Sequence, residues 1–273
     1  MRRGVRGLGG HFPLIGMIHL RALPGSPDYE GVFEPILATA CAEAQLLAEA
    51  GFDALMVENF GDAPFYPDRV PAITVAAMTR ALTELREATA LPLGVNVLRN
   101  DGAAAIAVAA ATGADFVRVN VLIGATATDQ GILEGRAHEI ARLRTQLAPG
   151  VAILADARVK HGRPIAPIPL AEEVADLVER GGADAVLLTG ARTGEPPEPA
   201  EFEEARRGAG DAPLLVASGV SAANVSALAK VADGAIVGTS LKRGGRTTAP
   251  LDRGRIRRLV AAVQGARSAR GRR

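Results

Sequence analysis

Scarce polar side chains lie at the ends of short apolar runs in this sequence. The chain contains 28 arginines but only three lysines, and Lys160 follows one of these runs. Glu58 ends another run and Asp156 lies within a third. A carboxylate can act as a general acid or base, and a nearby lysine can stabilise developing negative charge. We therefore expect proton transfer by Glu58 or Asp156 and electrostatic stabilisation by Lys160. A Schiff base at Lys160 is an alternative that no feature of the sequence favours.

Other polar residues share this placement at the ends of apolar runs. A buried charge is costly unless it faces solvent or a partner, so these side chains are expected to meet at one solvated mouth. Those assigned to catalysis beside the first three are His19, Asn96 and Arg99. Those assigned to substrate binding are Asn59, Arg118, Asn120, Asp129 and His161. Any one of them alone is equally well explained as a structural ion pair, but their convergence favours a site.

Small residues follow the last two apolar runs. Ser218 and Gly219 come after one run, and Gly238, Thr239 and Ser240 come after the other. Backbone N–H groups in such turns can approach an anion, and helix N-termini add positive potential. The two loops together therefore predict a phosphate site.

No cofactor is identified from the sequence, and no metal ligand is assigned. His19, Glu58, Asp156 and His161 carry ligand atoms, but no two of them share an HxH or HExxH spacing. If a metal takes part, Mg²⁺ bridging a substrate phosphate is favoured over an enclosed zinc ion.

The polar groups require a scaffold that brings many strand ends together. Strand-like and helix-like segments alternate eight times, which predicts a single (β/α)₈ TIM barrel of the α/β class. A doubly wound open sheet is the alternative. The expected strands span Leu14–Leu20, Asp53–Glu58, Leu93–Arg99, Phe116–Val121, Val151–Lys160, Asp184–Thr189, Pro213–Ser218 and Gly234–Thr239. Helical spacing is clearest in Pro35–Ala50, Pro71–Ala90, Gly131–Leu147 and Leu170–Arg180.

A weak repeat supports the closed barrel. A small residue and an aspartate precede four of the strands, at Asp53, Asp115, Asp184 and Asp233. A loop connects the second expected strand to the helical segment that follows it, and Pro64 and Pro67 stiffen this loop. It carries the aromatic residues Phe60, Phe65 and Tyr66, and we expect it to cover the site.

The ends of the chain differ in charge from its body. Residues 1–10 carry three arginines and residues 253–273 carry eight, with no acid in either segment, so the net charge of +1 leaves −10 for the body. We expect a basic N-terminal tail at 1–12, the barrel at 13–265 and a basic C-terminal tail at 266–273. Such tails can contact anionic lipid, but no nucleic-acid motif accompanies them.

Composition excludes several classes of protein. Cys41 is the only cysteine, so an intrachain disulfide and a cysteine-built zinc site are ruled out. No apolar run approaches the roughly 18 residues of a transmembrane helix. We expect a cytoplasmic protein, with peripheral membrane contact through the tails as an alternative. Alanine-rich helices would suit a homo-oligomer.

Long motifs in the chain resemble the BtpA/SgcQ family. The most specific are Gly16–Leu20, Val57–Pro67, Gly94–Asp101, Thr128–Gly131 and Gly238–Lys242, and the resemblance runs from about residue 14 to 242. It implies a fold similar to ribulose-phosphate-binding barrels and an association of the founding member with photosystem I biogenesis. No catalytic residue carries over from the family.

Two functions follow as expectations. One is an enzyme that acts on a small phosphorylated sugar or nucleoside as a lyase, an isomerase or a glycosyl-bond-cleaving enzyme. The other is a non-catalytic assembly factor that uses the barrel as a scaffold. The density of polar residues at the strand ends favours the enzyme.

Overall fold

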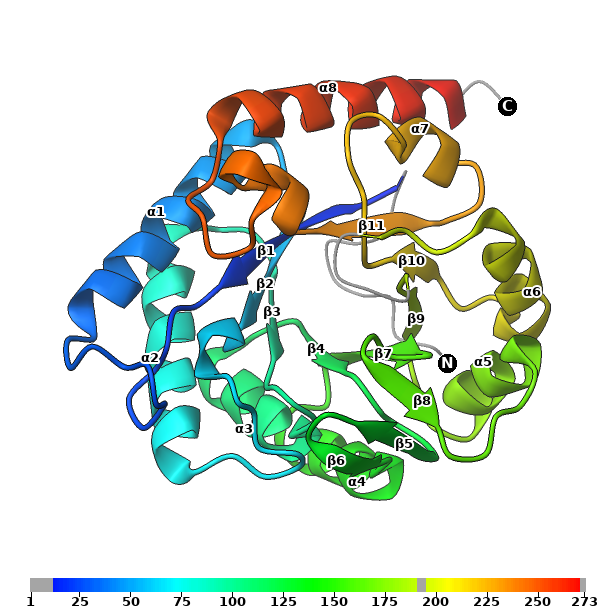
Figure 1. Ribbon diagram of the computed structural model, residues 1–273, viewed down its shortest axis with the longest axis horizontal. Coiled ribbons are helices and arrows are strands. Elements are labelled where there is room, and N and C mark those ends of the chain that lie inside the picture. The colour runs from blue at the N-terminus through cyan, green and yellow to red at the C-terminus, as the bar shows by residue number, and fades with distance from the viewer. Residues whose placement is uncertain (1–11, 191–194, 271–273) are drawn as a thin grey trace.

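Eight parallel strands close into a barrel in the computed structural model, which describes residues 12–190 and 195–270. The prediction of a single (β/α)₈ barrel is confirmed, and the open sheet is excluded (Figure 1). The barrel strands are β1 (Leu14–His19), β2 (Ala54–Glu58), β3 (Leu93–Asn96), β4 (Phe116–Val119), β7 (Ala152–Ala157), β9 (Ala185–Leu188), β10 (Leu214–Val216) and β11 (Gly234–Val237).

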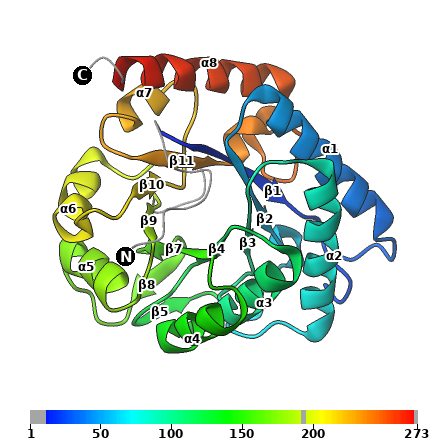
Figure 2. The same ribbon diagram turned by 180° about the vertical axis from the view of Figure 1, so that it is seen from behind.

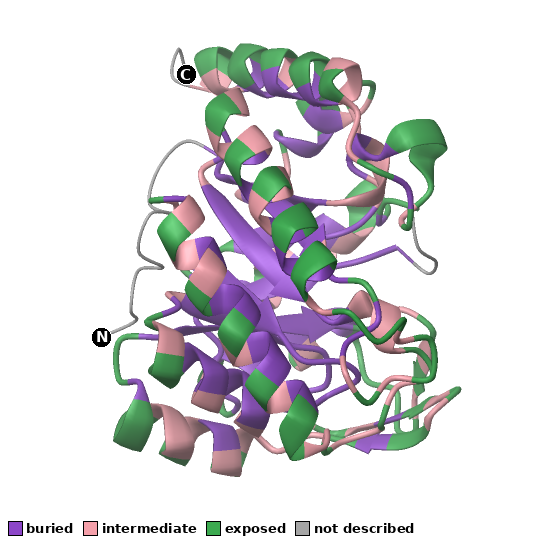
Figure 3. Cartoon of the chain, turned by 90° about the vertical axis from the view of Figure 1, so that its left-hand side faces the viewer, coloured by how far each residue is buried: buried purple, intermediate pink, exposed green. Residues whose placement is uncertain are grey.

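Helices surround the barrel on its outer side (Figures 1 and 2). They are α1 (Glu34–Ala50), α2 (Ala72–Ala88), α3 (Gly102–Thr112), α4 (Ala137–Leu147), α5 (Leu170–Glu179), α6 (Pro199–Ala209), α7 (Val225–Leu228) and α8 (Arg253–Arg270). Short 3₁₀ turns are η1 (Phe60–Asp62), η2 (Thr239–Leu241) and η3 (Arg243–Gly245). Figure 3 shows the strands buried and the outward helix faces exposed.

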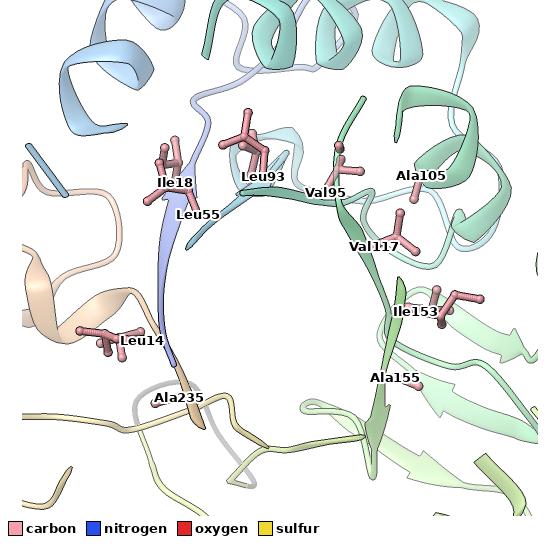
Figure 4. Close-up of a cluster of buried hydrophobic side chains, with 14 of the residues drawn as sticks. Leu14, Ile18, Leu55, Leu93, Val95, Ala105, Val117, Ile153, Ala155 and Ala235 are labelled. Carbon is pink, nitrogen blue, oxygen red and sulfur yellow. The ribbon is translucent and has the colours of Figure 1, made fainter. Parts of the chain in front are cut away.

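Alternation along each strand divides the core into two parts. Side chains such as Leu14, Leu55 and Ile153 point outward and pack between sheet and helices (Figure 4). The residues between them, including Met56 and Leu154, fill the barrel interior as a separate cluster. The period of two continues to the strand ends, so Glu58 and Asp156 are on the interior side. The alternation thus points the expected catalytic carboxylates inward.

Phe116 occupies much of the barrel interior next to Gly94. A Cβ atom built on Gly94 would lie 2.0 Å from the Phe116 ring, and that ring is fully buried. Any larger residue at position 94 would overlap the ring. This glycine is therefore required by packing.

The repeated aspartates fasten the opposite end of the barrel. Each accepts a hydrogen bond from a backbone N–H at the start of a neighbouring strand, for example from Ile153 to Asp184 at 2.9 Å. Each also pairs with an arginine on a helix. The pairs are Asp53–Arg267, Asp115–Arg86, Asp184–Arg144 and Asp233–Arg206. The repeat seen in the sequence therefore joins strands to helices away from the mouth.

Two expectations about local structure were wrong. The segment Gly131–Leu147 was expected to be one helix, but Gly131–Glu134 forms β6 and the helix begins at Ala137. Strand β6 pairs with β5 (Ala125–Thr128), which also pairs with β8 (Gly162–Pro164), in an antiparallel sheet beside the mouth (Figure 1). The second error concerns the strand expected to reach Lys160.

That strand ends at Ala157, because Arg158 adopts a left-handed φ of 53°. Arg158 and Lys160 consequently do not continue the strand face of Asp156. Arg158 instead pairs with Glu173 on α5, at 3.7 Å between Nε and Oε2.

The chain ends are bound to the barrel where the structure describes them. Helix α8 continues past residue 266, where the basic C-terminal tail was expected to begin, and ends at Arg270. Arg267 donates to the backbone oxygen of Phe12, and Arg270 donates to that of Ala232. Of the expected N-terminal tail, residues 1–11 lie outside the described residues. Within the described ranges, no helix has the length and apolar character needed to cross a membrane.

Candidate functional site

A cavity of about 1530 Å³ opens at the carboxyl ends of the barrel strands, and we call it the mouth cavity. Its wall contains 13 of the 16 residues expected from the sequence to form the site. These are His19, Glu58, Arg99, Arg118, Asn120, Asp129, Lys160, His161, Ser218, Gly219, Gly238, Thr239 and Ser240. The other three, Asn59, Asn96 and Asp156, lie behind the wall and contact residues that form it.

Glu58 is a buried carboxylate in the cavity wall. It ends β2 and is only 7% exposed. The next strand places Asn96 directly beside it, and Asn96 Nδ2 donates to Glu58 Oε2 at 2.6 Å. This contact fixes one carboxylate oxygen and leaves the other, Oε1, without a hydrogen-bond donor among the described residues. Glu58 is therefore positioned to exchange a proton with a bound molecule.

Asp156 is fully enclosed by its partners. Its side chain has no exposed surface, and Arg118 Nε and Nη2 contact both carboxylate oxygens at 3.0–3.2 Å. Asn120 Nδ2 also donates to Asp156 Oδ2, at 2.5 Å. The expected acid/base role does not suit this arrangement, because both oxygens are already engaged. Asp156 instead orients Arg118 and Asn120 toward the cavity.

The ion pair with Asp156 favours the charged form of Arg118. Burial opposes the charged guanidinium, but Asp156 and Glu58 outweigh burial and raise the pKa of Arg118 above its ordinary value. Asn120 is 3% exposed, and its Oδ1 atom is buried with no hydrogen-bond partner in the described structure. The wall thus presents a fixed cation to the cavity.

Lys160 and Arg99 form the neighbouring part of the wall. Lys160 Nζ lies 3.2 Å from the carbonyl oxygen of Ala217 across the mouth, and Arg99 Nη2 donates to the carbonyl oxygen of Lys160 at 2.6 Å. Burial and the positive charge of Arg118 lower the pKa of Lys160 from 10.5 to about 8, although Asp156 and Glu58 act in the opposite direction. Lys160 is therefore partly neutral near physiological pH.

His19 is a neutral member of the site. Burial, followed by the charges of Lys242, Lys160 and Arg118, lowers its pKa from 6.5 to about 3. Its Nδ1 atom is buried without a partner among the described residues, and its ring contacts Phe60 edge to face at 5.0 Å between centroids. Neutral imidazole can donate or accept a hydrogen bond, so His19 suits ligand recognition better than proton abstraction at pH 7.

Asn59 holds the loop that was expected to cover the site. Its Oδ1 accepts from the backbone N–H of Leu98 at 2.7 Å, and its Nδ2 donates to Asp62 at 3.0 Å. Asp62 in turn accepts from the backbone N–H of Leu23 at 2.8 Å. Phe60 and Phe65 on this loop line the cavity. The expected substrate contact of Asn59 is replaced by a role in fixing this wall.

The two small-residue loops lie side by side in the cavity wall. Ser240 Oγ on one loop donates to the carbonyl oxygen of Val220 on the other at 2.5 Å. Thr239 begins η2, and N–H groups in a first helical turn lack acceptors within the helix. An anion placed here would meet donors from the backbone.

The glycines of these loops are explained by packing. A Cβ atom on Gly219 would lie 2.2 Å from the backbone nitrogen of Pro196, and one on Gly238 would lie 2.5 Å from the His19 ring. Their small size therefore accommodates protein neighbours. We expected the small size of these glycines to admit a phosphate. The groups that could contact a phosphate here are instead backbone N–H donors and one further side chain.

That side chain is Arg255, which the sequence reasoning missed. It lies in the first turn of α8, lines the cavity with Gly219 and Thr239, and donates to the carbonyl oxygen of Ser240 at 3.4 Å. It was assigned to a basic terminal segment because arginines are frequent there. Its position at the start of the helix that follows the last strand of a barrel was the available signal.

The remaining predicted residues border the cavity opening. Asp129 contacts Gln130, and His161 has a left-handed φ of 56° in the turn before β8. No three His, Cys, Asp or Glu side chains of the described ranges form a group that could hold a metal ion. His19, Glu58, Asp156 and His161 consequently do not form a magnesium site by themselves.

Comparison with known proteins defines the family of the chain. The model of the BtpA family matches residues 10–265, which includes the whole site. The chain belongs to the BtpA family. A family relative from Synechocystis, a photosystem I biogenesis protein, is 44% identical over 253 residues, covering 93% of this chain and 88% of the relative. An uncharacterized relative from Thermococcus kodakarensis is 48% identical and covers 91% of this chain and 94% of its own length.

Solved structures agree with the barrel of this BtpA-family chain. The N-(5′-phosphoribosyl)anthranilate isomerase of Pyrococcus furiosus superimposes with a TM-score of 0.57 at 18% identity, covering 93% of this chain and 100% of the isomerase. Identity at this level supports a shared fold and leaves the chemistry to be argued from the site itself.

Proposed function

We propose that this protein is an enzyme that acts on a small phosphorylated sugar or nucleoside by acid/base chemistry in the mouth cavity. The observation that carries the proposal is that a single cavity wall combines two kinds of polar group. Glu58, Lys160 and Arg118 lie in this wall together with the two small-residue loops and Arg255. This combination suits a substrate with a reacting centre and a phosphate.

At the reacting centre, Glu58 transfers the proton. Arg99, Arg118 and Lys160 all interact electrostatically with Glu58. The same cations stabilise negative charge that develops on a substrate oxygen. His19 and Asn120 contribute their unpartnered buried atoms as hydrogen-bonding groups. These roles are compatible with an isomerase, a lyase or a glycosyl-bond-cleaving enzyme.

Arg255 and the backbone N–H groups that begin η2 bind the phosphate. A guanidinium recognises phosphate oxygens through a planar pair of donors. Magnesium, if the reaction uses it, would enter with the substrate phosphate. Ser218, Gly219, Gly238 and Thr239 shape this part of the site and supply backbone contacts.

Turnover by a matched pair of variants tests the proposal. The purified protein is incubated with a set of phosphorylated sugars and nucleosides, and products are followed by NMR. Glu58→Gln should lower the rate of any conversion by about 10²–10⁴-fold. Glu172→Gln, on the exposed side of α5, should leave it unchanged. Conversion that survives in Glu58→Gln would remove Glu58 from the mechanism.

A second candidate is a non-catalytic assembly factor. The Synechocystis relative is named for photosystem I biogenesis. In this chain Arg253, Arg257 and Arg258 are exposed on α8 and could contact an acidic partner or an anionic membrane. Removing the helix would not test this role, because Ile256 and Leu259 are buried against the barrel.

Charge reversal tests the second candidate without loss of packing. The triple variant Arg253→Glu, Arg257→Glu and Arg258→Glu should lose binding to vesicles that contain phosphatidylserine if the helix is a membrane contact. Under the enzyme proposal, turnover by this variant stays at the wild-type level. Loss of vesicle binding together with absence of turnover in the wild type would favour the assembly role.

A further inference from the structure

Lys160 differs from the other two lysines of the chain in its surroundings. Lys242 is buried and paired with Glu43, at 2.6 Å between Nζ and Oε1, and Lys230 is exposed on the surface. Lys160 is half-buried in the wall of the mouth cavity, and its Nζ donates a hydrogen bond to the carbonyl oxygen of Ala217. Within the described ranges no carboxylate lies within ion-pair distance of this amine.

The nearby carboxylates are held by other groups. Asp156 is occupied by Arg118 and Asn120, and Glu58 accepts from Asn96. The cations Arg118 and Arg99 meanwhile repel a charged Lys160. These surroundings weaken the preference of Lys160 for its charged form, and its lowered pKa of about 8 leaves a fraction of the amine neutral near physiological pH.

The choice of residue type supports a chemical role for the amine. The chain uses arginine for 28 of its 31 basic residues, and an arginine at this position could supply the same positive charge. Arginine does not lose its proton in proteins, whereas lysine can and then becomes a nucleophile. A lysine in the cavity of an arginine-rich chain provides reactivity that arginine lacks.

We infer that Lys160 forms an imine with the carbonyl carbon of a phosphorylated aldehyde or ketone bound in the mouth cavity. This inference rests on the proposed function, because the phosphate end of the cavity would hold the substrate. The neutral Nζ attacks the carbonyl carbon and forms an N–C bond, while the carbonyl oxygen takes a proton and the nitrogen loses one. The resulting carbinolamine hydroxyl accepts a further proton and leaves as water as the nitrogen lone pair forms the C=N bond.

Glu58 is the group placed to move these protons. It faces the same cavity, and its charge interacts with that of Lys160. The protonated imine then withdraws electrons from the adjacent carbon, which eases removal of a proton from that carbon or cleavage of a bond to it. The sequence is balanced by water alone and requires no oxidant or reductant. The inference narrows the reaction class to isomerisation or lyase chemistry next to a carbonyl.

Trapping with borohydride tests the inference. The full-length protein is incubated with dihydroxyacetone phosphate or with unphosphorylated dihydroxyacetone, reduced with sodium borohydride and digested for peptide mass spectrometry. Three lysines make the assignment direct. The expected result is modification of Lys160 at least about tenfold above that of Lys230, with the phosphorylated probe favoured. In Lys160→Arg the adduct at this peptide should disappear.

Two further readouts separate the inference from the proposed function. Modification of wild-type Lys160 by trinitrobenzenesulfonate should rise with pH through a midpoint near pH 8. A protein that binds dihydroxyacetone phosphate in a thermal shift assay but gives no adduct at Lys160 would overturn the imine and leave the phosphate site standing. Equal trapping of both probes at Lys160 would support the amine chemistry and count against the phosphate site.

Discussion

Arg118 and Asp156 form a buried ion pair, with 3.0–3.2 Å between the guanidinium nitrogens and both carboxylate oxygens. The pair stands directly behind the mouth cavity, and only its arginine reaches the cavity wall. The carboxylate therefore acts through the arginine. Glu58 and Asp156 have similar positions in the sequence, but they differ in the structure because Glu58 faces the cavity and Asp156 does not.

Removing one member of this pair should be costly. Asp156→Leu leaves the Arg118 charge buried and unpaired, so we expect the free energy of unfolding to fall by about 3–5 kcal/mol in urea denaturation. The double variant Asp156→Leu with Arg118→Met should recover most of this loss, because no charge is then left unpaired. Arg180→Gln, which breaks an exposed pair with Asp176, should cost less than about 1 kcal/mol. Equal losses in the single and double variants would contradict the pairing argument.

The charge of Lys160 should make stability depend on pH in the alkaline range. Its folded pKa of about 8 lies below the value of 10.5 expected for the unfolded chain. Between these values the unfolded chain binds a proton that the folded protein lacks, so stability rises with pH. The total gain is on the order of 3 kcal/mol, scaled from the size of the shift. Lys160→Met should be more stable near pH 7 and should lack this rise. Parallel pH profiles for the two proteins would show that Lys160 is not destabilised by its surroundings.

His19 should remain neutral where an ordinary histidine becomes charged. Its pKa of about 3 means that its imidazole signals in NMR spectra should not move between pH 8 and pH 5. The signals are assigned by their absence from His19→Gln. Below pH 6.5, His19 binds a proton in the unfolded chain but stays neutral in the folded protein. This difference lowers the stability of the fold as the pH falls toward 3. A titration midpoint near 6.5 would contradict the buried neutral state.

Much of the fold follows from local patterns in the sequence. The eight short runs of Val, Ile and Leu separated by helical segments correspond to the eight barrel strands, since a parallel sheet covered on both faces gives such runs. The antiparallel sheet of β5, β6 and β8 was not foreseen. Its strands have three or four residues each, and the apolar residues of Gly131–Glu134 fit a helix pattern equally well.

The membership of the site was easier to predict than the roles within it. Thirteen expected residues line the cavity because inward positions at strand ends converge. Which carboxylate faces the cavity depends on partners from other strands, and a single strand does not reveal them. Arg255 was missed because its role depends on the first turn of α8 lying against the mouth cavity, which the sequence does not reveal.

The barrel interior should not tolerate even one added methyl group at Gly94. Gly94→Ala places Cβ in the Phe116 ring and should lower the free energy of unfolding by about 1–3 kcal/mol. Adding Phe116→Leu should restore part of that stability, as it makes space beside residue 94. Gly150→Ala is the control, because nothing lies within 4 Å of a Cβ built there. If Gly94→Ala and Gly150→Ala proved equally stable, the interior would be less tightly packed than the structure indicates.

Selective binding of a phosphorylated ligand is the central claim, and thermal shift measurements test it most directly. Sugar phosphates, nucleotides and their unphosphorylated parents are compared, with and without Mg²⁺, on the wild type, Arg255→Gln and the exposed-site control Arg257→Gln. A ligand present at 100 times its Kd stabilises the folded state by about 2.7 kcal/mol. We expect at least one phosphorylated compound to raise the midpoint while its parent does not, with the shift lost in Arg255→Gln and kept in Arg257→Gln. No shift with any phosphorylated compound, or equal shifts with the parent compounds, would contradict the account.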